Sequence, residues 1–233
     1  HPGDPDLTLD PAIDPNWLAA DLLDLYLAVG EDIPFEGLFE PEEMPEGSNN
    51  WIISGARTQS GFPILANDPH RRIALPSLRY IVHLKAPGWN VIGGGEPVIP
   101  GVSIGHNDHG AWGLTIFQSD AEDLYVYELN PANPNQYKYK SEWEDMTLIE
   151  ERIAIKGQPD SLVTLRYTRH GPVTYLDTKN HRAAAVRAAW LEPGAAPYLA
   201  SLRMNQATNW AEFQEACNYS FIPGENMIWA DKT

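Results

Sequence analysis

The stretch Glu46-Gly47-Ser48-Asn49-Asn50-Trp51 lies where the composition of the 233-residue sequence changes most abruptly. Residues 1–47, here called the leader, carry 13 Asp or Glu and neither Lys nor Arg, whereas residues 48–233 carry 19 acids and 16 bases. Seven prolines also fall in the leader, so much of it is expected to be extended and solvated. The sequence therefore predicts two parts, an acidic linker over 1–47 and a folded domain over 48–233.

One helix is predicted inside the leader. Asp14 can cap it, Pro15 suits the first helical position, and Gly30 can close its C-terminus. The apolar stripe expected of a surface helix consists of Leu18, Leu22, Leu25 and Val29.

After Ser48 the sequence consists of short β-rich runs separated by Gly, Pro and Asn, a pattern typical of strands and turns. Helical patterns come near the end, at 198–204 and then at 209–217, where Asn209 can cap the helix and Glu212 follows three residues on. The sequence thus predicts an α+β fold in which strands dominate. The expected strands are 51–53, 64–66, 80–85, 111–117, 124–129, 146–155, 161–167 and 183–190.

The composition argues against several classes of protein. Apolar residues make up 43% of the chain, enough for a sizeable core. No long apolar run and no basic segment followed by an apolar one occurs, so neither a membrane span nor a signal peptide is predicted. A net charge of -16 without a basic stripe disfavours nucleic acid as a partner. Cys217 is the only cysteine, which excludes an internal disulfide.

Three familiar motifs do not fit. The run Gly93–Gly95 is followed by an acidic residue and a proline rather than by a helix, so we interpret it as a flexible turn and not as a phosphate loop. His106 and His109 stand three residues apart in a Gly- and Asn-rich segment, which indicates a polar turn between strands rather than a zinc site. A Gly-x-Ser-x-Gly elbow is missing, so a hydrolase of this sequence would lack that conventional arrangement.

Ser48 has the features of a nucleophile that carries its own base. A free α-amino group has a pKa of roughly 7.7 to 8.0 and can accept the Oγ proton directly or through one water. That amine exists only after the Gly47–Ser48 bond is cut, and Gly47, which lacks Cβ, tolerates the strained backbone that attack by the Ser48 hydroxyl requires. The alternative is that residues 47–50 form an ordinary turn, and on the tetrapeptide alone the turn is the better interpretation.

Six sequence blocks downstream of Ser48 favour the nucleophile instead. They are 65–70 (LANDPH), 104–107 (IGHN), 111–113 (AWG), 167–172 (YTRHGP), 225–226 (EN) and 229–231 (WAD). In order and spacing they resemble the penicillin acylase family of N-terminal nucleophile hydrolases, in which a serine after a small residue begins the mature β-chain. The resemblance covers about residues 46–233. It implies a four-layer αββα sandwich of which this chain is a part, with the leader as a linker or the end of an α-chain.

The resemblance also implies the other site residues. The backbone N–H of Ile116 would donate to the tetrahedral oxyanion, and a second donor, an Asn side chain, would lie beyond Thr233. His70 stands at a position beside the nucleophile, where it would orient the amine or the oxyanion. The alternative is that Asn67, Asp68 and His70 merely close a turn.

Residues Asp120-Ala121-Glu122-Asp123 place three carboxylates within four residues. In the resembled family this segment supplies calcium ligands, so Asp120, Asp123 and the carbonyl of Glu122 would be three of the roughly 6 to 8 oxygens that a structural Ca²⁺ takes. The alternative is a solvated acidic turn. The partner carboxylate that family members contribute from the α-chain is not identifiable in this sequence.

These implications predict an amidohydrolase that cleaves the side-chain amide of β-lactam-type or N-acyl substrates through an acyl-Ser48 intermediate, after autoproteolysis at Gly47–Ser48. Its expected partners are this small-molecule amide and the remaining α-chain and β-chain segments of the same precursor, and its expected location is periplasmic or secreted. The 233-residue chain alone is expected to be inactive, because an uncut Ser48 has no amine. The alternative from another class is a catalytically silent calcium-binding or structural module that is never processed.

Overall fold

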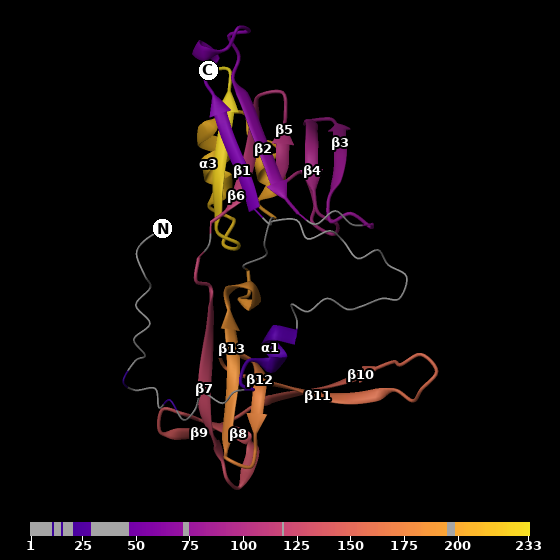
Figure 1. The fold of residues 1–233 in the computed structure, drawn as a ribbon, viewed down its shortest axis with the longest axis vertical. Helices are drawn as coiled ribbons and strands as arrows, with labels where there is room; N and C mark the ends of the chain where they lie inside the picture. Colours follow the sequence, from indigo (N-terminus) through magenta and orange to yellow (C-terminus); the bar gives the residue numbers. More distant parts are fainter. Residues whose placement is uncertain are drawn as a thin grey trace. The chain divides into compact units, whose positions relative to one another are not determined.

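The computed structural model contains two compact units, each built mainly of antiparallel strands (Figure 1). Unit 1 comprises residues 1–34 and 122–188, and unit 2 comprises residues 35–121 and 189–233. Within the described part of the chain, no helix is long and apolar enough to cross a membrane. The structure describes residues 11, 15, 21–28, 47–71, 75–117, 119–194 and 199–233.

The centre of unit 2 is a five-stranded antiparallel sheet in the order β14-β6-β5-β4-β3. Small and apolar residues fill β6, whose Trp112, Gly113 and Leu114 are all buried. The strands are β3 (Tyr80–Ala86), β4 (Trp89–Gly95), β5 (Ile104–His106), β6 (Gly110–Ile116) and β14 (Glu225–Asp231).

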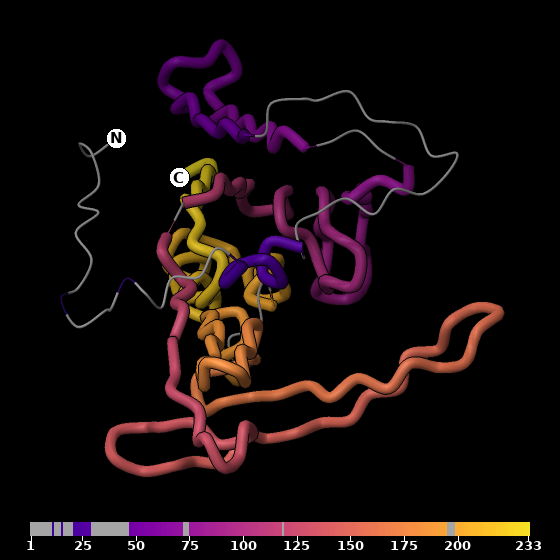
Figure 2. Tube along the Cα trace, turned by 60° about the horizontal axis from the view of Figure 1, so that its bottom comes forward, coloured from indigo at the N-terminus to yellow at the C-terminus, as the bar shows by residue number. Residues whose placement is uncertain are grey.

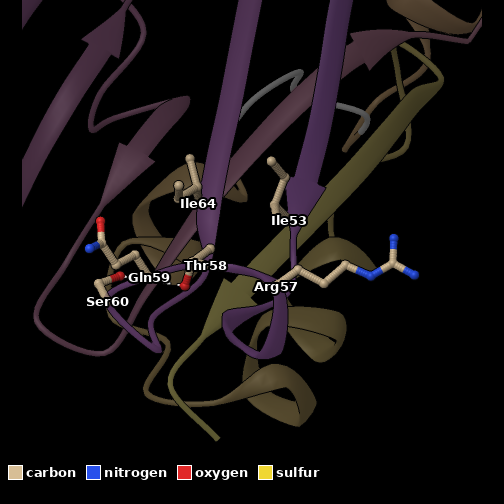
Figure 3. Close-up of a pocket in the computed structure, with 6 residues that line it drawn as sticks. All are labelled: Ile53, Arg57, Thr58, Gln59, Ser60 and Ile64. Carbon is tan, nitrogen blue, oxygen red and sulfur yellow. Dashed lines mark hydrogen bonds between the residues drawn. The ribbon is translucent and has the colours of Figure 1, made fainter.

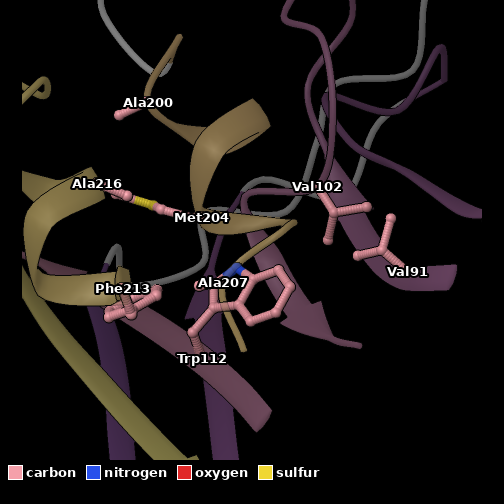
Figure 4. Close-up of a cluster of buried hydrophobic side chains, with 8 residues drawn as sticks. All are labelled: Val91, Val102, Trp112, Ala200, Met204, Ala207, Phe213 and Ala216. Atoms are coloured by element: carbon pink, nitrogen blue, oxygen red, sulfur yellow. The ribbon is translucent and has the colours of Figure 1, made fainter. Parts of the chain in front are cut away.

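Helices α2 (Ser201–Met204) and α3 (Trp210–Cys217) pack their apolar side chains against one face of this sheet (Figure 4). The fully buried Trp112 ring stacks on Trp229, its partner in β14, with 6.2 Å between ring centroids, and lies 6.3 Å from the ring of Phe213 in α3. The predicted cap of α3 is confirmed, because Asn209 Oδ1 accepts the N–H of Glu212. Strand β6 and the last helix therefore share one core.

A two-stranded antiparallel ribbon, β1 (Gly47–Ile53) paired with β2 (Ile64–His70), lies against β6 and β14. Neighbouring residues of a strand point to opposite faces of a sheet. Trp112 points toward α3, whereas a Cβ on the next residue, Gly113, would lie 2.6 Å from Asn67 Oδ1 of β2. The ribbon and the helices thus cover opposite faces of the sheet, and unit 2 has three layers.

Unit 1 contains a seven-stranded antiparallel sheet in the order β10-β11-β12-β13-β7-β8-β9, with β10 and β11 drawn out into a long ribbon (Figure 2). Its core includes Tyr127, Leu129 and Tyr137, which are all less than a tenth exposed. The strands are β7 (Glu122–Asn130), β8 (Asn133–Tyr139), β9 (Glu142–Asp145), β10 (Thr147–Ile153), β11 (Ser161–Thr168), β12 (Gly171–Asp177) and β13 (Arg182–Ala188).

Part of the predicted leader helix is present in unit 1 as α1 (Asp24–Ala28). Leu22, just before it, is buried, and the hydroxyl of Tyr26 donates a hydrogen bond to the carboxylate of Glu122. The other predicted features of this helix, namely Asp14, Leu18, Val29 and Gly30, lie outside the described residues.

The flexible turn predicted at Gly93–Gly95 is wrong, because these residues form the end of β4. A Cβ on Gly93 would lie 2.1 Å from the carbonyl oxygen of Ile104 and 2.6 Å from the Cα of Gly105. The glycines therefore allow β4 and β5 to approach closely instead of bending the chain. The polar turn predicted at His106–His109 is confirmed, since β5 ends at His106 and β6 begins at Gly110.

Candidate active site

Ser48 is the second residue of β1, half-buried and paired with Pro69 of β2. The ladder continues on both sides, with Gly47 opposite His70 and Asn50 opposite Asn67. The interpretations of residues 47–50 and 67–70 as turns are therefore wrong. Both segments are strands, and their pairing places Gly47 beside His70 and Asn50 beside Asn67, although the partners are far apart in the sequence.

Asn67 joins the ribbon to β6. Its Nδ2 donates to the carbonyl oxygen of Asn49 at 2.9 Å, and its Oδ1 accepts the backbone N–H of Leu114 at 2.7 Å. On the other strand of the ribbon, Asn50 Nδ2 donates to the carbonyl oxygen of Asn226 in β14 at 3.4 Å. The strand that carries Ser48 is thus bonded to β14 through Asn50 and linked to β6 through Asn67 of β2.

The backbone N–H of Ile116 points away from β14. Phe117 N–H donates to the carbonyl oxygen of Gly224 at 2.9 Å, and hydrogen-bonded and non-hydrogen-bonded pairs alternate along an antiparallel ladder. Ile116, which stands opposite Glu225, is therefore in a non-hydrogen-bonded pair. Its N–H leaves β6 on the same edge as the N–H of Leu114, which Asn67 accepts.

That edge of β6 is open at Ile116 within the described chain. The neighbouring strand β5 pairs with Ala111 and Trp112 and does not extend as far as Ile116. Figure 1 shows that β1 begins and β6 ends at the same end of unit 2, so Ser48 and Ile116 lie toward a common end. The predicted oxyanion donor is thus a strand N–H that the pairing of β6 with β14 and β5 leaves for another acceptor.

His70 lies beside the predicted cleavage bond. A Cβ on Gly47 would be 3.6 Å from His70 Nδ1, so the imidazole faces the residue that precedes Ser48. On its other side, His70 Nε2 is 3.1 Å from Asp68 Oδ2. A carboxylate at one ring nitrogen fixes the orientation and tautomer of a histidine, so Asp68 is a further member of the site. Only its position two residues before His70, on the same strand face, signals this in the sequence.

The predicted calcium ligands, Asp120, Asp123 and the carbonyl oxygen of Glu122, lie at or just before the start of β7. The side chain of Glu122, which is not one of these ligands, accepts from Tyr26. The side chains of Asp120 and Asp123 are exposed. Among the residues that the structure describes, no group of three His, Cys, Asp or Glu side chains is placed to hold a metal ion. Two carboxylates and one carbonyl oxygen supply only part of the roughly 6 to 8 oxygens that Ca²⁺ takes, and the calcium site stays a prediction.

The cavity drawn in Figure 3 lies at the far end of the ribbon from Ser48, where η2 (Gly55–Arg57) follows β1. It measures about 480 Å³, and a hydrogen-bonded pair of hydroxyls, Thr58 and Ser60, forms part of its wall. Neither Ser48, His70 nor Ile116 lines it. This cavity is therefore separate from the candidate active site.

A serine on a paired strand, a histidine beside its preceding bond and a strand N–H toward the same end of the unit are the types of group that acyl transfer uses. A family model described as penicillin amidase matches residues 8–233. The chain therefore belongs to the penicillin amidase family.

Individual relatives agree with this assignment. The penicillin acylase 2 proenzyme of a Pseudomonas species (strain SE83) is 29% identical over 226 residues, which are 97% of this chain and 29% of that protein. The acyl-homoserine lactone acylase QuiP of Pseudomonas aeruginosa is 35% identical over 127 residues, 54% of this chain and 15% of that protein. A crystal form of the thermostable penicillin G acylase from Alcaligenes faecalis matches with a TM-score of 0.71 and 32% identity over 78% of this chain and 33% of that one. The chain thus spans a third or less of these relatives.

Proposed function

We propose that this chain forms the nucleophile-bearing part of an amidase that hydrolyses the amide of an N-acyl small molecule through an acyl-Ser48 ester. One observation carries the proposal: Asn67 of β2 links the strand that begins Gly47-Ser48 to β6, whose Ile116 N–H leaves the ladder at the same end of the unit. Membership of the penicillin amidase family supports the same reaction class.

The nucleophile arises by self-cleavage. Ser48 Oγ attacks the carbonyl carbon of Gly47, the C–N bond breaks as the nitrogen of Ser48 takes up a proton, and an ester then joins Gly47 to Oγ. Water hydrolyses this ester, which leaves a carboxylate on Gly47 and a free amine on Ser48. His70, whose ring faces Gly47, orients Ser48 in this step.

The free amine then acts as the base for amide hydrolysis. It accepts the Oγ proton as Oγ attacks the substrate carbonyl, and the Ile116 N–H donates to the oxygen that becomes negatively charged. The proton passes to the leaving nitrogen, the amine product departs, and water hydrolyses the acyl-Ser48 ester to a carboxylic acid. Pre-positioned N–H donors of this kind contribute more than donors that must reorganise during the reaction.

The rest of the protein completes the site and the fold. The three layers of unit 2 are a part of the proposed four-layer αββα sandwich, and other α-chain and β-chain segments supply the remaining layer and the second oxyanion donor. Substrates are the side-chain amides of β-lactam-type or N-acyl compounds, consistent with the penicillin and acyl-homoserine lactone acylases among the relatives. The location is periplasmic or secreted.

Intact mass and amide turnover of a full-length precursor test the proposal. Wild type should split between Gly47 and Ser48 and release p-nitroaniline from phenylacetyl or fatty-acyl anilides. Ser48→Ala should remain one chain and lose turnover, because it lacks the Oγ that attacks both Gly47 and the substrate, and no free amine forms to act as the base. The control Ser60→Ala, in the exposed connection between β1 and β2, should behave as wild type. Wild-type protein that hydrolyses these amides while uncut would contradict the mechanism, and wild type that does neither would favour a silent module.

A further inference from the structure

We infer that Asn67 is a positioning residue for the proposed reaction, because its one side-chain amide links the strand of the nucleophile to the strand of the oxyanion donor. The inference rests on the proposed function of Ser48 and Ile116. It adds a residue that touches neither the substrate nor the reacting atoms and acts only through the backbone on both sides.

The two hydrogen bonds of Asn67 reach backbone groups one residue from Ser48 and two residues from Ile116. Its Nδ2 donates to the carbonyl oxygen of Asn49, the residue after Ser48, at 2.9 Å. Its Oδ1 accepts the N–H of Leu114 at 2.7 Å, and this N–H lies on the same β6 edge as that of Ile116, two residues on. A shift of either bond changes the position of Ser48 relative to the Ile116 N–H.

The amide fits its place closely. A Cβ on Gly113 would lie 2.6 Å from Asn67 Oδ1 and 3.0 Å from Asn67 Cβ, so only a glycine at 113 leaves room for it. The half-buried Asn67 is short enough to reach both strands, and its amide offers one donor and one acceptor to two backbone groups that require opposite partners. No substitution that removes the amide keeps both bonds.

Asn50 provides a matched control, since it stands directly opposite Asn67 in the ladder. Its Nδ2 makes a longer contact, 3.4 Å, to the carbonyl oxygen of Asn226 in β14. Asn50→Ala therefore removes an amide of the same size from the same ribbon. It leaves both hydrogen bonds of Asn67, to Asn49 and to Leu114, in place.

The experiment compares variants of the full-length precursor by self-cleavage, by steady-state turnover per titrated acyl-enzyme site, and by melting temperature. Asn67→Ala should lower kcat on the order of 10²-fold with little change in KM, because displacement of reacting groups raises the barrier without removing ground-state contacts to the substrate. Self-cleavage should slow as well. Gly113→Ala should reproduce the kcat loss while retaining the Asn67 amide, and Asn50→Ala should keep kcat within about twofold of wild type.

Counting turnover per titrated site separates positioning from folding, because molecules that fail to fold are not titrated. If Asn67→Ala does not accumulate, Asn67→Asp takes its place, since it keeps the acceptor for Leu114 and loses only the donor to Asn49. A kcat per site within about twofold of wild type for the Asn67 variant, or an equal loss in Asn50→Ala, would overturn the inference. Ser48→Ala that still cleaves and hydrolyses would instead overturn the proposed function and would leave the Asn67 comparison as a statement about folding alone.

Discussion

At the residue scale, His170 of unit 1 lies among three tyrosines. Its ring stacks on Tyr125 at 4.0 Å between centroids and meets Tyr139 edge-on at 5.8 Å. The hydroxyl of Tyr127 lies 2.5 Å from His170 Nδ1. Burial raises the pKa of Tyr127 to about 12, so the phenol keeps its proton and donates a hydrogen bond to Nδ1 of a neutral imidazole.

Protonation of His170 should destabilise the fold. Burial first, then the positive charges of Arg187 and Arg169, lower the pKa of His170 against the opposite effect of Glu144. As the pH falls below about 6.5, the ordinary imidazole pKa, the unfolded chain takes up the proton before the folded one, and the free energy of unfolding decreases. The stabilising contribution is thus present above this pH and lost below it. We expect the melting temperature of wild type to fall more steeply than that of His170→Gln between about pH 7.5 and 5.

The control is His181→Gln, because His181 is exposed between β12 and β13. This variant should follow the wild-type pH profile. Parallel profiles of wild type and His170→Gln would show that His170 does not couple folding to pH.

Most residues of the candidate site could be predicted from the sequence. Ser48, Gly47, His70 and Ile116 could be predicted because short blocks in family order surround them, and the structure brings them to one end of unit 2. Asn67 could not be assigned its two bonds, because hydrogen bonds that cross 18 and 47 positions leave no mark in local spacing. Its role is a property of how the ribbon lies on β6.

At the element scale, β4 and β5 pack through glycines. Gly93→Ala should lower the free energy of unfolding by about 2 to 4 kcal/mol, because the new Cβ meets rigid backbone rather than a side chain that can move. A Cβ on the neighbouring Gly94 would lie 3.7 Å from the carbonyl oxygen of Tyr80, an ordinary contact. Gly94→Ala should therefore change the free energy of unfolding by no more than about 0.5 kcal/mol. Urea unfolding of the full-length protein measures the free energy of unfolding of both variants. Equal losses would contradict the explanation that Gly93 lets β4 and β5 approach closely.

The strands that the sequence predicts are those with β-branched or aromatic runs, such as β3, β6, β7 and β11. It misses β4, whose Gly93–Gly95 end has the composition of a turn, and β8, whose Asn-Pro-Asn-Gln start is polar. In both cases a neighbouring strand supplies the pairing that local propensity opposes. Pairing with a neighbouring strand, rather than local sequence, therefore makes β4 and β8 strands.

At the scale of the whole molecule, calcium tests whether other segments of the protein complete the predicted metal site. If Asp120 and Asp123 bind Ca²⁺ together with carboxylates from other segments, chelation should lower the melting temperature of the full-length protein by several degrees, since a bound ion stabilises the folded state by mass action. Asp123→Asn should abolish this difference. The exposed Asp160→Asn should preserve it. Equal melting temperatures of wild type with excess calcium and with chelator would count against the site.

The sequence predicts a composition boundary at residue 47, whereas the compact units divide the chain after residues 34, 121 and 188. Charge and proline content report where a chain is solvated or cut, and they carry little information about which distant strands share a core. The pairing of β13 with β7 builds one unit from segments more than fifty residues apart, which no local pattern encodes.

The ladder that pairs Gly47 with His70 also has an entropic consequence. A chain end in water ordinarily frays, and a catalytic group on it would have to be immobilised again in each turnover. Six of the seven residues of β1 follow the proposed cut, and they stay paired along β2 up to Ile53. If the proposed cut occurs, folding immobilises the new terminus once, before any substrate arrives, and raises the effective molarity of the base at the hydroxyl that it serves.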